Sequence, residues 1–100
     1  MKLKKGVRTL GIRPELVLAI MVAEKIYLDK GKELVITSLS GGEHSDTSLH
    51  YAGSGVDLRT RYFTKKQKLE VFNALKKKLT RDYDVILEKT HIHIEYQPRR

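Results

Sequence analysis

Histidine and aspartate side chains stand in two separate segments of this sequence at spacings that suit a metal site. The first segment reads Ser48-Leu-His-Tyr-Ala-Gly-Ser-Gly-Val-Asp57, so that His50 and Asp57 are separated by a stretch with two glycines. The glycines allow a tight turn, which brings the imidazole and the carboxylate to one point. The second segment is His91-Ile92-His93.

Together the two segments would supply three protein ligands for one metal ion. His50, Asp57 and one histidine from the second segment would leave the fourth position of a tetrahedral zinc for water, which is the layout of a catalytic rather than a structural zinc site. The chain has no cysteine, which excludes disulfides, thiolate metal sites and thiol catalysis. The alternative for the first segment is a glycine-rich turn with an incidental histidine.

Helix and strand patterns surround these residues. Pro14 suits the first position of a helix, and apolar residues at helical spacing predict that this helix spans residues 14–29. A β-prone run at 33–37 follows Gly31, and a loop begins at Ser38. This loop carries His50 of the first segment. Loops on a rigid scaffold often hold functional groups.

The second half of the chain predicts a strand at 56–59, a helix and two more strands. Thr64-Lys-Lys-Gln67 has the form of a capping box that opens the helix, whose apolar stripe is expected to include Leu69 and Leu75. The last two strands are expected at 85–87 and 90–96. In the final strand, alternation places His91, His93 and Glu95 on one face. The order predicts a single α+β domain over residues 1–100, with a small antiparallel sheet and two helices on one side.

Charge and hydropathy limit the partners. The net charge is +8, which favours polyanionic surroundings such as a cell wall, anionic lipid or nucleic acid. The tyrosines and phenylalanines form no evident stacking platform, so we expect no specific nucleic-acid partner. The amino terminus lacks the apolar run of a signal peptide, and no stretch is long and apolar enough to cross a membrane. We therefore expect a soluble protein without membrane insertion.

The motif Ser-x-His-x-x-Gly-x-x-x-Asp, followed by His-x-His near the end of a strand, resembles the hedgehog/D-Ala-D-Ala peptidase family over about residues 33–97. That family includes zinc D,D-carboxypeptidases, phage L-alanyl-D-glutamate endopeptidases and the hedgehog signalling domain. The small size is most similar to compact phage-encoded members. The resemblance implies a monomeric zinc peptidase or endolysin, of phage or prophage origin. Such a protein would reside in the host cytoplasm or the virion and act on peptidoglycan stem peptides.

The resemblance also implies roles for individual residues. His50, Asp57 and His93 would bind Zn²⁺, and His91 would stabilise the oxyanion or donate a proton. In the substrate-binding group, His44 stands where relatives place a basic side chain that meets the substrate carboxylate. The other two members of this group are Ser48, which could form a hydrogen bond within the loop, and Arg59, which could bind a carboxylate.

One position departs from the family pattern. Relatives carry Asp or Glu as general base three residues before the last ligand, where this chain has Thr90, whose hydroxyl cannot accept a proton near neutral pH. Glu88 stands three residues before His91 and would restore Glu-x-x-His if His91 were the ligand. Strand alternation allows that register only with a bend or bulge. Glu88, His91 or neither then acts as base, and the alternative function is a zinc-containing domain that binds wall peptides or a protein without turnover.

Overall fold

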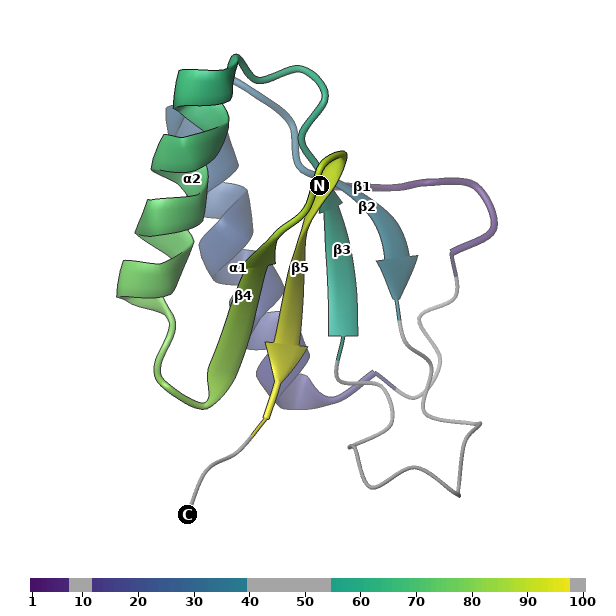
Figure 1. The fold of residues 1–100 in the computed structure, drawn as a ribbon. Helices are drawn as coiled ribbons and strands as arrows, with labels where there is room; N and C mark the ends of the chain where they lie inside the picture. Colours follow the sequence, from purple (N-terminus) through teal and green to yellow (C-terminus); the bar gives the residue numbers. More distant parts are fainter. Residues whose placement is uncertain (8–11, 40–54, 98–100) are drawn as a thin grey trace.

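The computed structural model describes residues 1–7, 12–39 and 55–97. Its elements are β1 (Lys2–Leu3), α1 (Pro14–Asp29), β2 (Val35–Leu39), β3 (Gly55–Arg59), α2 (Lys65–Lys78), β4 (Tyr83–Leu87) and β5 (His91–Tyr96), as drawn in Figure 1. The predicted α+β class is confirmed, and α1 has the predicted bounds. Tyr83 and Asp84, which precede the strand predicted at 85–87, also belong to β4, because they pair with Tyr96 and Glu95 of β5.

The five strands form one mixed sheet in the order β1-β2-β3-β5-β4. The expectation of an antiparallel sheet is wrong at one edge, where β1 runs parallel to β2. The backbone N–H groups of Lys2 and Lys4 donate to the carbonyls of Leu34 and Ile36, and α1 provides the crossover that a parallel pair requires. A strand of two residues is too short to show a periodic pattern, which explains why the sequence did not reveal it.

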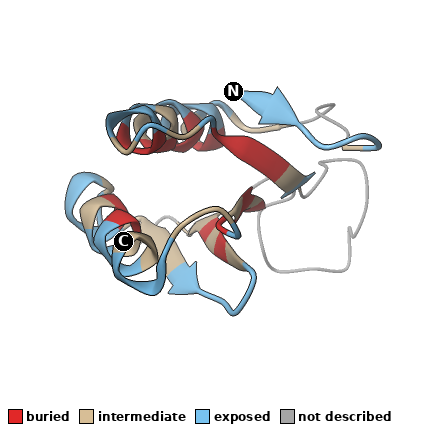
Figure 2. Cartoon of the chain, turned by 90° about the horizontal axis from the view of Figure 1, so that it is seen from above, coloured by how far each residue is buried: buried red, intermediate tan, exposed pale blue. Residues whose placement is uncertain are grey.

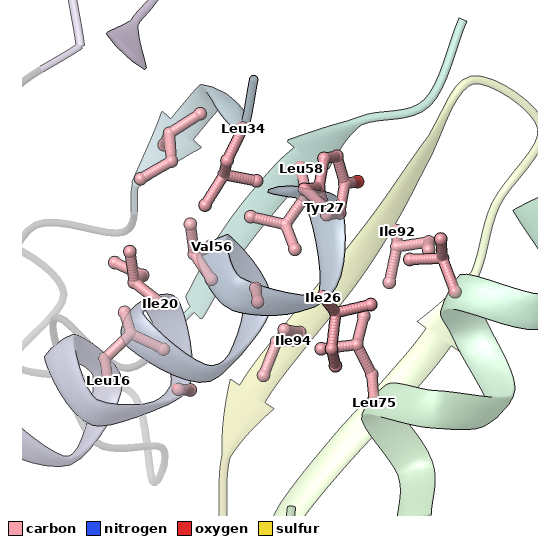
Figure 3. Close-up of a cluster of buried hydrophobic side chains, with 14 residues drawn as sticks. Leu16, Ile20, Ile26, Tyr27, Leu34, Val56, Leu58, Leu75, Ile92 and Ile94 are labelled. Atoms are coloured by element: carbon pink, nitrogen blue, oxygen red, sulfur yellow. The ribbon is translucent and has the colours of Figure 1, made fainter. Parts of the chain in front are cut away.

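Both helices cover the same face of the sheet, as Figures 1 and 2 show. The face beneath them is apolar because alternate strand residues point inward. Val56 and Leu58 of β3 and Ile92 and Ile94 of β5 are fully buried or nearly so. They meet α1 side chains such as Ile20 and Ile26 in the core shown in Figure 3. The opposite face of these strands therefore carries their polar side chains.

The second helix begins at the predicted capping box. The Thr64 hydroxyl accepts a hydrogen bond from the backbone N–H of Gln67, whose side chain accepts one in return from the Thr64 N–H. Its buried side chains are Val71 and Leu75. The expectation for Leu69 is wrong, because this residue is 50% exposed on the outer side of the helix.

Two hydrogen-bonding side chains tie the helices to the strands that carry the candidate site. The Tyr27 hydroxyl of α1 donates to the carbonyl of Arg59 at the end of β3 (2.8 Å). Lys68 of α2 donates from Nζ to the carbonyls of Glu88 and Lys89 in the β4–β5 turn (2.6 and 2.7 Å). Within the described part of the chain, no helix has the length and apolar character needed to cross a membrane.

Candidate functional site

The sheet face opposite the helices carries a grid of polar side chains on three adjacent strands. β5 lies in the middle and contributes His91, His93 and Glu95, which alternation places on this face as predicted. Between β3 and β5, Arg59 pairs with His91, Asp57 with His93 and Gly55 with Glu95. Between β4 and β5, Ile86 pairs with His93 and Asp84 with Glu95. Residues from both halves of the chain thus meet on one surface.

The closest contact on this face joins Asp57 and His93. Their Oδ1 and Nδ1 atoms lie 2.6 Å apart although the residues are 36 positions apart in the sequence. Both side chains are partly exposed, at 25% and 24%. The two described members of the predicted ligand set are therefore direct neighbours, and solvent reaches them.

Glu95 holds the other nitrogen of the same imidazole. Its Oε1 atom lies 2.9 Å from His93 Nε2, and its second oxygen accepts a hydrogen bond from the Gln97 side-chain amide at 3.2 Å. Strand alternation predicted Glu95 on this face but gave it no role. The signal was present in the alternating pattern, since a residue two positions after a histidine on a strand lies on the same side.

The two carboxylates raise the pKa of His93 above its ordinary value. Burial by itself lowers this pKa, but the hydrogen bonds to Glu95 and Asp57 and the negative charge of both groups outweigh it. Each ring nitrogen lies at hydrogen-bond distance from a carboxylate oxygen, an arrangement that favours the protonated imidazole, in which both nitrogens are donors.

His91 lies one step along the strand from this pair. Its Nε2 atom is 3.6 Å from Asp57 Oδ1, and its Nδ1 atom is 3.1 Å from the hydroxyl of Thr90. Asp57 is therefore close to both histidines of the His-x-His segment, but its hydrogen bond is to His93. This geometry favours His93 over His91 as the partner of Asp57.

Glu88 stands across the β4–β5 turn from His91. Its backbone N–H donates to the carbonyl of His91 at 2.9 Å, which continues the ladder by one pair beyond Leu87 and Ile92. Ile86 pairs with His93 and so lies on the open face of the sheet. Glu88 is two residues further along the chain and therefore lies on the same face, beside His91. The tight turn at residues 89–90 supplies the bend that the alternative register required, and Thr90 lies exposed at its tip.

The substrate-binding group is only partly described. Arg59 is half-buried at the end of β3 and lies beside His91 on the open face, two residues from Asp57. His44, Ser48 and the ligand His50 lie outside the described residues. The structure therefore joins Asp57, His93, His91, Arg59 and Glu88 on one surface, and the roles of the three loop residues stay predictions.

The residues present fit a zinc site in chemical type. Carboxylate oxygen and imidazole nitrogen are usual zinc ligands, and tetrahedral bonds of about 2.0–2.2 Å put two ligand atoms about 3.3–3.6 Å apart. The observed 2.6 Å between Asp57 and His93 is a hydrogen-bond distance, so both atoms could bind one ion after moving apart by less than about 1 Å. Among the described residues no group of three has the arrangement of a metal site. The predicted set takes its third member, His50, from outside them.

Comparisons with protein-family models, with curated proteins and with solved structures find no match to this chain.

Proposed function

We propose that this protein is a zinc-dependent peptidoglycan peptidase, a carboxypeptidase or endopeptidase of phage or prophage origin that hydrolyses an amide bond involving a D-amino acid. The observation that carries the proposal is the contact between Asp57 and His93. The motif selected these two residues as ligands from segments far apart in the sequence. Their side-chain contact on a solvent-exposed face supports that choice.

His50, Asp57 and His93 would hold the zinc ion. A metal shared with Asp57 would meet the Nδ1 side of the His93 ring, which is the side that faces Asp57. Glu95 would then accept the Nε2 proton and fix the ring, and Gln97 would hold Glu95. Such a carboxylate partner is the usual companion of a metal-binding histidine. Glu95 is in this account a positioning residue.

Bound zinc would supply a water of lowered pKa and polarise the scissile carbonyl. The protein's own residues would move the protons and hold the substrate. Glu88 and His91 lie on the same face at the turn, where a carboxylate could accept a proton and an imidazole could return it to the leaving amine. Arg59 lies beside His91 and could bind a substrate carboxylate.

A binding domain without turnover is the second candidate, and the exposed Thr90 favours it. This residue occupies the position of the usual acidic base, and its hydroxyl contacts His91. In that case, the same face would bind a wall peptide or a protein through zinc and Arg59.

Incubation of the zinc-loaded protein with purified muropeptides, followed by mass spectrometry, tests the proposal. A peptidase releases new amino or carboxyl termini, and Asp57→Ala and His93→Ala abolish this release. If muropeptides bind in a zinc-dependent manner without being cleaved, the binding domain is correct. Cleavage that persists in both variants would refute the assigned site.

A further inference from the structure

A groove lies on the helical layer, between α1 and the last turn of α2, away from the sheet face that carries Asp57 and His93. Its volume is about 330 Å³, and it is lined by Met21, Val22, Lys25, Ile26, Asp29 and Lys78. The first five of these belong to α1, whereas Lys78 closes the groove from α2. Figure 1 shows the two helices side by side. A hollow of this size accepts several apolar side chains of a ligand.

The α1 side of the groove combines apolar and charged residues along one row of the helix. Leu18, Val22, Lys25 and Asp29 follow one another at i, i+4, i+7 and i+11, which places them in one row along the helix. Leu18 of this row and Met21 beside it are 58% and 61% exposed. Large apolar side chains beside a concave surface mark interaction sites more often than a uniformly polar helix face does.

Positive charge surrounds this groove. Lys25 and Lys78 form part of its lining, and Lys76 and Lys77 belong to the same last turn of α2. Because the chain carries a net charge of +8, a second copy would bring like charges together at this surface. The charge therefore favours an acidic occupant over self-association.

The shape of the groove favours an acidic helix over an anionic membrane as its occupant. The row from Leu18 to Asp29 is about 16 Å long at 1.5 Å per residue, which matches about three turns of a bound helix. A flat lipid surface would not fill a hollow between two helices, and it would bring negative charge against Asp29. A helix can place its acidic residues opposite the lysines alone.

We propose that this groove binds an acidic amphipathic helix of a partner protein. The apolar face of the partner fills the space over Val22 and Ile26, while its acidic residues pair with Lys25 and Lys78. This is the helix-in-groove mode of recognition, in which residues at i, i+4 and i+7 serve as anchors. The groove and the zinc site lie on opposite sides of the sheet, so the proposal does not depend on the proposed peptidase activity.

Synthetic peptides of about 18 residues test the proposal, with Leu at i, i+4, i+7 and i+11 and either Glu or Lys at the flanking positions. Binding to the full chain is measured by fluorescence anisotropy, and the contact site is mapped by backbone amide shifts. We expect the Glu peptide to bind and to shift the amides of residues 18–29 and 78. Met21→Glu should weaken its binding roughly tenfold or more, because an apolar contact is lost and an acid is introduced. Leu69→Glu, at an exposed leucine on the side of α2 away from Lys78, should leave it unchanged.

A charge swap sharpens the test. The double variant Lys25→Glu, Lys78→Glu should prefer the Lys peptide, while the wild type prefers the Glu peptide. No binding of the Glu peptide by the wild type at about 1 mM overturns the proposal, as does equal affinity for both peptides. It is also overturned if vesicles of phosphatidylglycerol bind through Met21 and the Glu peptide does not, since the surface would then be a membrane contact.

Discussion

Asp57 of β3 and His93 of β5 are paired residues of adjacent antiparallel strands, and their side chains touch on the face of the sheet that the helices leave open. The pairing register fixes this contact. A shift of one residue in either strand would turn one of the two side chains into the core. Buried Leu58 and Ile92 oppose such a shift, because they would then lie on the polar face.

The environment of His93 predicts a pH dependence for the metal-free protein. Its folded pKa is raised above the value of about 6.5 expected in the unfolded chain. The contribution of His93 to stability is therefore complete below about pH 6.5 and is lost as pH rises through the folded pKa. Urea unfolding in the presence of a chelator should show a midpoint that falls as the pH rises above about 6.5. In His93→Gln that fall should shrink, and an identical fall in both proteins would contradict this assignment.

Glu95→Gln tests the positioning role of Glu95. An amide cannot hold the His93 ring as a carboxylate does, so zinc affinity should drop about 10- to 100-fold. Glu88→Gln, on the same face but away from His93, serves as the matched control and should keep its affinity. The measurement is a competition titration with a chromophoric chelator. Equal affinity of Glu95→Gln and wild type would remove Glu95 from the site.

Glu88 and Thr90 decide between the two candidate functions. If Glu88 is the base, Glu88→Gln should lower kcat on muropeptides roughly 10²- to 10⁴-fold with zinc content unchanged. If instead Glu88 is not the base, the wild type should turn over slowly, and Thr90→Asp, which places an acid at the position of the family's usual base, should raise turnover. A wild type that cleaves at full rate while Glu88→Gln is unaffected would show that neither expectation holds.

The capping box of α2 predicts a stability effect away from the site. Thr64→Ala removes the acceptor of the Gln67 N–H and should cost about 0.5–2 kcal/mol in free energy of unfolding. Thr64→Ser keeps the hydroxyl and should unfold close to wild type in urea. If Thr64→Ala unfolds at the same urea concentration as the wild type, the Thr64 cap contributes nothing to the free energy of unfolding.

Local patterns in the sequence predict most of the fold. Pro14 marks the start of α1, the Thr64 box marks the start of α2, and strict alternation assigns the faces of His91 and His93. These features depend on neighbours in the chain. The parallel pairing of Lys2 and Leu3 depends on a distant strand, so no local pattern reveals it.

The same distinction between local patterns and distant contacts applies to the candidate site. The alternating strand fixed which side chains share a face, but the contacts of Glu95 with His93 and of Glu88 with the turn depend on side-chain geometry and on the length of the turn. Sequence spacing alone could not place Glu88 beside His91, because a two-residue turn reverses the direction of the chain. The register across three strands settles that question.

Zinc stoichiometry, measured by elemental analysis after equilibrium dialysis at neutral pH, tests whether this protein holds a metal ion at His50, Asp57 and His93. We predict one zinc per chain in the wild type and in His91→Ala, and loss of stoichiometric zinc in His50→Ala, Asp57→Ala and His93→Ala. Circular dichroism checks that each variant folds. A folded wild type that retains no zinc would contradict the account, as would loss of zinc in His91→Ala with retention in His93→Ala.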